Sequence, residues 1–277
     1  MRYLVQAQES KNYAKRDGAS RHSLMNKLVN FPLLVFAFSF PALWVSAFIG
    51  AFFRKKLRPL GEGDREDFGV VLTAALTLLG LLVGFTFSMA VSRYEQRKNY
   101  EEAEANAIGT EYVRAGLLPT ADAVRARKLL SDYLDQRVLF YTASDDQQLR
   151  QIDTKTAQLQ NDLWSVVQDR AAAQPTPIVA LAVAGMNDVL NSQGYTQAAW
   201  RNRIPVEAWV LLIAIAIGCN LLIGYGAHRT DSFLFMVLPL AVSISFFLIA
   251  DIESPRSGVI RVQPQNLLSL SETLHAH

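Results

Sequence analysis

The sequence predicts an all-α integral membrane protein with four transmembrane helices and a cytoplasmic helical domain inserted between the second and the third. Three observations predict this fold class. The chain of 277 residues is 51% hydrophobic, with a mean hydropathy of +0.14. Its apolar residues gather in four segments, each long enough to cross the hydrocarbon core of a bilayer. The region 92–205, between the second and third segments, is polar and has helical periodicity.

Glu207 is the only charged residue in the four candidate spans, which cover about residues 31–53, 68–91, 206–225 and 232–250. Each span is expected to be a helix, because a backbone in lipid must satisfy its hydrogen bonds internally. The first span follows a polar stretch and lacks a clear small-residue cleavage site. We therefore interpret it as a span and not as a signal peptide.

Four spans place both termini and the middle region on the same side of the membrane. Lysine and arginine are frequent in these parts near the span ends, so the positive-inside rule makes segments 1–30, 92–205 and 251–277 cytoplasmic. The basic run 54–58 lies on the opposite side and opposes this orientation.

The net charge of +2 and the lack of a dense basic block predict no nucleic-acid partner. The basic clusters beside the spans are explained by topology or by contact with anionic membrane lipid. Cys219 is the only cysteine, which excludes an intramolecular disulfide. No metal site or cofactor is expected, since no ligand spacing with carboxylates is shared by His22, His228, His275 and His277.

The second span has one face of small and hydroxyl residues, at the helically spaced positions Thr73, Thr77, Gly80, Gly84, Ser88 and Ser92. Leu81 and Phe85 lie along the edge of this face. A helix needs no such face merely to meet lipid, so the face is expected to contact water in a pore or another helix. Gly80 and Gly84 suit the second reading as well, because glycine lets helices pack closely in membranes.

The middle region is predicted to be helical throughout. The helix of the second span continues to about Val113, and Thr120 is expected to cap the next helix. A third helix begins near 144–146, and prolines end it before a shorter helix over 176–190 and a turn at 191–194. The third helix has an apolar seam of coiled-coil spacing, formed by Leu149, Ile152, Thr156, Leu159, Leu163 and Val166. This seam suits the core of a helical bundle, an interface between subunits or a partner site.

No motif of an enzyme is present: the sequence has no phosphate-binding glycine loop, nucleophile elbow or cysteine–histidine cluster. We interpret the acidic residues at 101, 102 and 104 as ion pairs with Arg97 and Lys98 at helical spacing. In the segment 104–110, Asn106 among small residues predicts a close helix contact with a hydrogen bond across it. The alternative is a polar pore lining or a ligand contact.

Asp251 and Glu253 follow the fourth span directly. Carboxylates at this boundary favour a structural role, with a cation site at a channel mouth as the alternative. Ile204 precedes Pro205 at the start of the third span, where proline suits the first turn of a helix.

These motifs together resemble the bestrophin family of ion channels, and the chain is most similar to bacterial bestrophin-like membrane proteins. The resemblance covers about 68–270 in layout. It rests on the second-span exit from Gly84 to Tyr94, the Ile-Pro pair at 204–205, and short motifs at 104–110, 117–119, 250–255 and 264–268.

The resemblance implies a homopentameric channel for small inorganic ions in the bacterial inner membrane, with anions slightly favoured. It assigns a pore neck to Thr77, Leu81 and Phe85 and a cytoplasmic aperture to Ile204. In such a channel the small and hydroxyl face of the second span meets water, so Thr73, Gly84, Ser88 and Ser92 are further pore-lining candidates. It also implies no enzymatic activity. The alternative function is a non-conducting membrane adaptor whose cytoplasmic domain binds a partner through the apolar seam.

Four departures from the bestrophin pattern stand out. Thr77 replaces an apolar neck residue, and the proline expected beside it is absent. The acidic run of animal bestrophins is missing after Pro255, so no calcium clasp is expected. The stretch between Ile204 and Asp251 is also shorter than in bestrophins.

Overall fold

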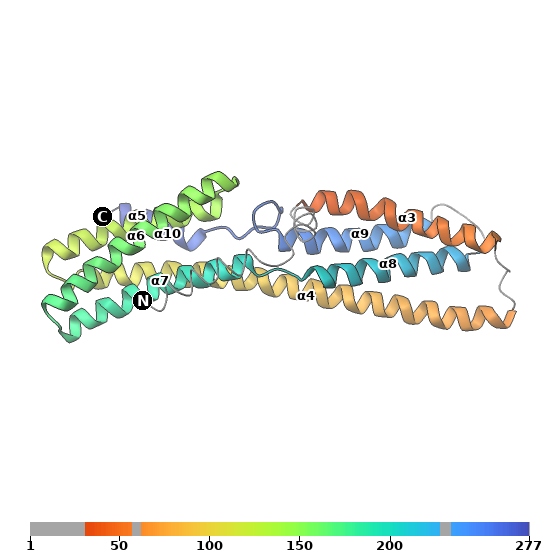
Figure 1. Ribbon diagram of the computed structural model, residues 1–277, viewed down its shortest axis with the longest axis horizontal. Helices are drawn as coiled ribbons and strands as arrows, with labels where there is room; N and C mark the ends of the chain where they lie inside the picture. Colours follow the sequence, from red (N-terminus) through yellow and green to blue (C-terminus); the bar gives the residue numbers. More distant parts are fainter. Residues whose placement is uncertain (1–30, 57–61, 228–233, 277) are drawn as a thin grey trace, which may run out of the picture. The chain divides into compact units, whose positions relative to one another are not determined.

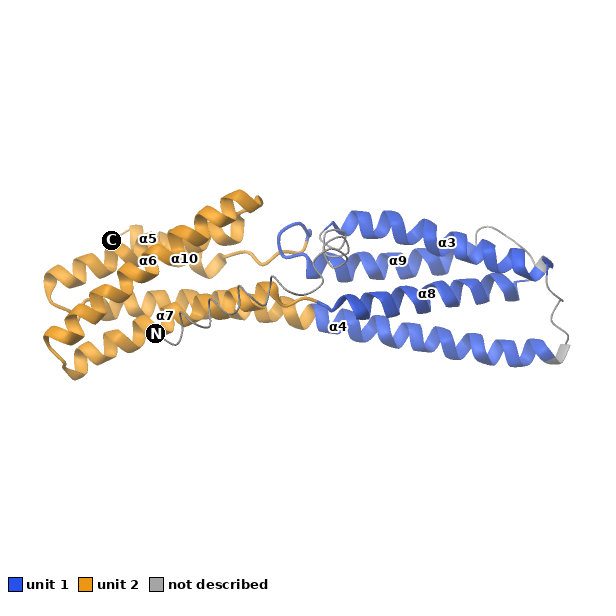
Figure 2. Cartoon of the chain, viewed as in Figure 1, with its two compact units in different colours: residues 1–90, 204–259 blue, residues 91–203, 260–277 orange. Residues whose placement is uncertain are grey.

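The computed structural model describes residues 31–56, 62–227 and 234–276, and within them all regular secondary structure is helical (Figure 1). Its helices are α3 (Pro32–Lys56), α4 (Glu62–Ala115), α5 (Thr120–Thr142), α6 (Asp146–Ala173), α7 (Pro177–Arg201), α8 (Val206–Gly226), α9 (Leu234–Glu253) and α10 (Gln265–His275). The chain forms two compact units, shown in Figure 2. Unit 1 comprises 1–90 and 204–259, and unit 2 comprises 91–203 and 260–277.

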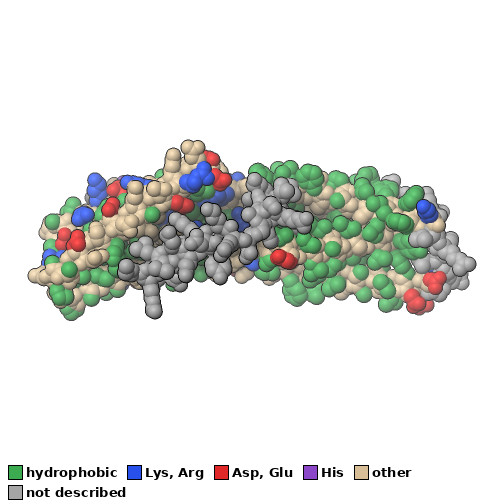
Figure 3. Space-filling model, in the orientation of Figure 1, with side chains coloured by type: hydrophobic (Ala, Val, Ile, Leu, Met, Phe, Trp, Pro, Cys, Tyr) green, Lys and Arg blue, Asp and Glu red, His purple; other side chains and the backbone are tan. Residues whose placement is uncertain are grey.

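In unit 1, α3 packs against α8 and α9. Glycines allow α3 and α8 to approach closely: a Cβ at Gly50 would overlap the carbonyl oxygen of Leu221, and one at Gly224 would overlap that of Ala47. Small residues at such crossings are typical of membrane helices, which associate through tight packing. Figure 3 shows hydrophobic side chains over most of the visible face of this unit.

Four helical stretches of the described chain are long and apolar enough to cross a membrane, and they include α3, α4, α8 and α9. Helix α4 has 54 residues, so it is about 80 Å long at 1.5 Å per residue. A bilayer core is only about 30 Å thick. The uncharged stretch 68–91 fits this thickness, and the charged half of α4 from Ser92 onward extends beyond this apolar stretch.

Unit 2 is a helical bundle of α5, α6, α7, α10 and the second half of α4. Its core includes Ile108, Leu134 and Met186, each fully buried. The seam of α6 belongs to this core: Ile152, Thr156, Leu159, Leu163 and Val166 are all at most 4% exposed. The bundle-core reading of the seam is therefore confirmed, and the seam is not free for a partner protein.

Two helix starts in unit 2 match the sequence and one does not. Asp145 caps α6 by accepting a hydrogen bond from the Gln148 amide at 3.3 Å. Thr176 caps α7 by accepting one from the Val179 amide at 3.2 Å. The predicted cap at Thr120 is wrong, because α5 begins at this residue and its start has no side-chain cap.

The predicted turn at 191–194 is also wrong, since α7 continues through Gly194 to Arg201. Glycine inside a helix costs about 1 kcal/mol. Burial of Thr196, Ala199 and Trp200 beyond it offsets this cost. Helix α10 was not predicted from the sequence.

Some predictions lie outside the described residues. These are the polar segment 1–30, the start of the fourth span at Ser232, part of the basic run 54–58, and His22, His228 and His277.

Candidate functional site

Along residues 73–92, one side of α4 is covered by the chain and the opposite side is not. Leu79, Thr86 and Ala90 are at most 7% exposed and share the covered side, because their spacings of seven and four residues are helical. Half a turn away lies a face on which every side chain is exposed, and its residues are Thr73, Thr77, Leu81, Gly84, Phe85, Ser88 and Ser92. We call these seven residues the open face of α4.

The open face is exposed even where its side chains are large and apolar. Leu81 is 53% exposed and Phe85 is 63% exposed. A Cβ added at Gly80 or Gly84 would meet no atom within 4 Å. Only 6% of the most apolar window of α4 is buried, compared with 50% for α9. The helices of the described chain thus leave the open face of α4 largely uncovered.

Two hydroxyl groups of α4 have a partner inside the helix. Thr77 donates to the carbonyl oxygen of Thr73 at 2.9 Å on the open face. Thr86 donates to that of Leu82 at 2.7 Å on the covered side. Such bonds satisfy the hydroxyl proton in an apolar medium and leave oxygen lone pairs directed outward. The sequence-predicted neck and lining residues therefore share one face, and their role in a pore stays a prediction.

Asp251 and Glu253 are buried and bind backbone amides. Glu253 Oε2 accepts a hydrogen bond from the Ile204 amide at 2.9 Å, and Asp251 Oδ1 accepts one from the Val259 amide at 2.7 Å. Both carboxylates thus fix the chain on either side of the spans α8 and α9. Ile204 itself is only 5% exposed, and its assignment to an aperture stays a prediction.

In unit 2, the acidic residues of α4 bind other helices. Glu101 accepts hydrogen bonds at the start of α10, from Asn266 Nδ2 at 2.7 Å and from the Leu267 amide at 3.0 Å. Glu104 pairs with Arg137 of α5, in place of the expected partner along α4. Asn106 is exposed, so the hydrogen bond expected across a close helix contact stays a prediction.

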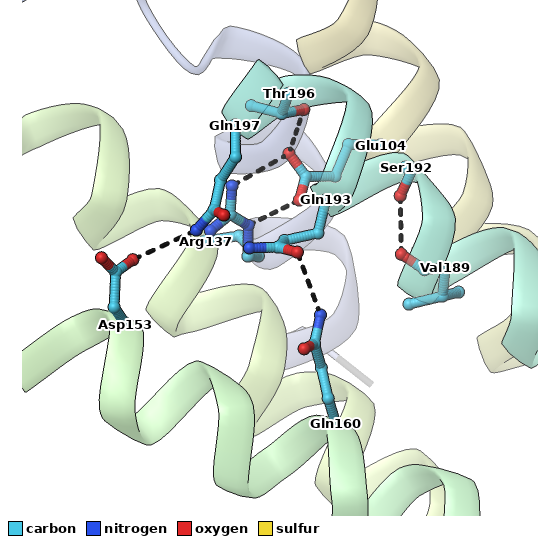
Figure 4. A network of polar contacts seen from close by, with 9 residues as sticks. All are labelled: Glu104, Arg137, Asp153, Gln160, Val189, Ser192, Gln193, Thr196 and Gln197. Carbon is cyan, nitrogen blue, oxygen red and sulfur yellow. Dashed lines mark hydrogen bonds and ion pairs between the residues drawn. The ribbon is translucent and has the colours of Figure 1, made fainter. Parts of the chain in front are cut away.

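The Glu104–Arg137 pair is the centre of a buried polar network, shown in Figure 4. Arg137 Nε lies 2.5 Å from Glu104 Oε1, and both side chains are fully buried. Thr196 of α7 donates to Glu104 Oε2 at 3.1 Å. The guanidinium carbon lies 4.4 Å from the centroid of the Phe140 ring. Burial alone would lower the pKa of Arg137, but the Glu104 carboxylate outweighs it and raises that pKa.

Sequence reasoning missed Arg137, although a signal was present. Arg137 lies three residues after Leu134 and four before Tyr141, on the apolar side of α5. One basic residue on a side that is otherwise apolar indicates a buried partner of opposite charge.

Comparison with known proteins gives two results on sequence. A family model described as a bestrophin-like domain matches residues 36–267. Among functionally curated proteins, none matches the chain.

Solved structures give the fold. A bacterial bestrophin homologue from Klebsiella pneumoniae with a tryptophan-to-alanine mutation is 13% identical and superposes with a TM-score of 0.61, over 87% of this chain and 94% of that chain. A leucine-to-threonine variant gives 13% identity and a TM-score of 0.60, over 88% of this chain and 98% of that one. The Klebsiella pneumoniae homologue solved by Zn-SAD phasing is 14% identical and superposes with a TM-score of 0.58, over 87% of this chain and 95% of that chain.

Proposed function

Because the chain belongs to the bestrophin-like family, whose members are known as ion channels, we propose that it is a homopentameric channel for small ions with α4 of each copy around the pore. In this proposal α3, the 68–91 stretch of α4, α8 and α9 cross the bacterial inner membrane. Unit 2 and both termini are cytoplasmic.

The open face of α4 carries this proposal. A lipid-facing helix gains nothing from a face of glycine and hydroxyl residues. A ring of identical copies brings the same face of each subunit to a common axis, where that face meets water and ions. The other three spans pack on one another, and α4 is the least buried of the four candidate spans in the described chain.

Thr77, Leu81 and Phe85 follow one another at one-turn spacing and form the proposed neck. Rings of Leu81 and Phe85 make an apolar constriction that closes by dewetting. Aromatic ring edges are electropositive, so the Phe85 ring slightly favours anions. Asp251 and Glu253 do not favour cations at a channel mouth, because both carboxylates are buried and accept hydrogen bonds from backbone amides. Ile204 is proposed as the second constriction and has to expose its side chain to act as one.

The test is ion flux in liposomes with a matched pair of variants. Purified protein is expected to be a ring-shaped homo-oligomer that dissipates an ionic gradient. Phe85→Ala widens the proposed neck and is expected to raise the leak several-fold or change anion–cation selectivity. Phe87→Ala is the control, because this residue is 39% exposed and points about 160° away on the same helix. A monomer without flux under any gradient refutes the channel, and equal currents in both variants remove Phe85 from the pore.

A further inference from the structure

A buried acid lies near the end of α4 in unit 2 and has no role in the proposed pore. Glu111 is 1% exposed, and neither of its carboxylate oxygens has a hydrogen-bond partner among the described residues. Its Oε2 lies against α7 at Gly185, where an added Cβ would overlap it. The same Cβ would lie 2.6 Å from Arg114 Nη1. A glycine on α7 therefore makes room for the acid at this contact.

Two charged groups act on Glu111 in this position. Arg114 follows it on α4, and Asp188 faces it from α7. The pKa of Glu111 is raised overall from 4.5 to about 8: burial raises it most, the Arg114 guanidinium lowers it, and the Asp188 carboxylate raises it. At neutral pH the side chain is therefore mostly the neutral acid. The neutral acid suits a position where neither carboxylate oxygen receives a hydrogen bond, because burying an unpaired carboxylate is costly.

We propose that Glu111 is a proton-operated latch between α4 and α7. The protonated side chain packs against Gly185 and holds the two helices together. When the proton leaves to solvent, the remaining carboxylate is stable only where water reaches it, so the α4–α7 contact loosens. The latch is a property of unit 2, and it is measurable whether or not the protein conducts ions.

The dependence on pH has a definite sign. Glu111 binds its proton more tightly in the closed contact than in an open contact, where its pKa has the ordinary value. Opening therefore becomes more favourable as pH rises from about 4.5, by about tenfold per pH unit, and levels off above about 8.

Hydrogen exchange of the full-length protein in detergent tests this proposal. After correction for the intrinsic effect of pH, peptides of 177–190 in α7 are expected to exchange faster as pH rises from 6 to 8, and then no faster. Peptides of 146–160 in α6 are the internal reference. Glu111→Gln keeps the shape without the titration and is expected to abolish the pH dependence. The same dependence in Glu111→Gln and in the natural protein overturns the latch.

Two further variants move the transition in opposite directions. Asp188→Asn removes a like charge and is expected to shift the midpoint to lower pH. Arg114→Gln removes an opposite charge and is expected to shift it to higher pH. Infrared titration of the protonated carboxyl band, with Glu111→Gln as the blank, reads the same midpoint without relying on exchange. An unshifted midpoint in both charge variants also overturns the proposal.

Discussion

Removing one member of the Glu104–Arg137 pair is expected to destabilise unit 2 severely. Arg137→Met keeps most of the side-chain volume but leaves the Glu104 carboxylate fully buried, with only the hydrogen bond from Thr196. Breaking a buried ion pair in this way costs about 3–5 kcal/mol, mainly because an uncompensated charge stays in the core. The loss is a large part of the roughly 5–15 kcal/mol that holds a domain folded.

A second change restores much of this loss. Glu104→Gln in the Arg137→Met background removes the buried charge while keeping an amide oxygen that accepts from Thr196. We therefore expect the double variant to regain at least half of the lost stability, because replacing both charges of a buried pair is often close to neutral. Glu104→Gln alone is expected to resemble Arg137→Met, since it leaves the guanidinium unpaired.

The assay is thermal unfolding of the full-length protein in detergent, followed by near-ultraviolet circular dichroism. Trp200 contributes to this signal, and its ring centroid lies 5.0 Å from that of Phe140 and 5.3 Å from that of Tyr141, beside the pair. Single variants are expected to lower Tm by about 10–20 °C for a domain of this size. Arg125→Met on the exposed side of α5 is the control, with a change within about 0.5 kcal/mol. Losses that simply add up in the double variant refute the reasoning.

The remaining predictions concern α10, the α3–α8 crossing and ion selectivity. Glu101→Ala removes the acceptor at the start of α10 and is expected to free this helix, raising hydrogen exchange around Leu267; unchanged exchange contradicts the cap. Gly224→Val cannot fit against α3 and is expected to abolish folded protein in size-exclusion chromatography, whereas a normal profile excludes the close crossing. Glu95 and Glu102 are exposed and lie on the same side of α4 as the open face. The double variant Glu95→Gln, Glu102→Gln is therefore expected to move the reversal potential toward greater anion preference. An unchanged reversal potential places both residues away from the ion path.

The four candidate spans could be predicted from the sequence, because a long apolar segment without charges is sufficient to indicate a membrane-crossing helix. The same holds for the seam of α6, where Leu159 and Leu163 repeat at a spacing that only a packed helix uses. The open face of α4 could also be located, since helical periodicity alone places Thr77 and Phe85 on the same side of the helix.

The polar interior of unit 2 could not be predicted, because a charged residue in a sequence does not reveal its partner. Glu104 and Arg137 are 33 residues apart, and only the fold brings them together. Glu111 was missed for the same reason, although it shares a helical side with the buried Glu104 and Ile108. The continuation of α7 through Gly194 depends on tertiary packing that local propensity does not contain.

The free side of α4 has a consequence for cells that make two versions of the protein. In the proposed channel this face is complete only in a ring, so each ring depends on all of its subunits. If normal and defective copies mix equally and at random in a five-membered ring, about one ring in 32 is wholly normal. A substitution such as Phe85→Ala is then expected to act dominantly in a mixed population. By contrast, a variant that prevents the fold of one copy removes only that copy from assembly.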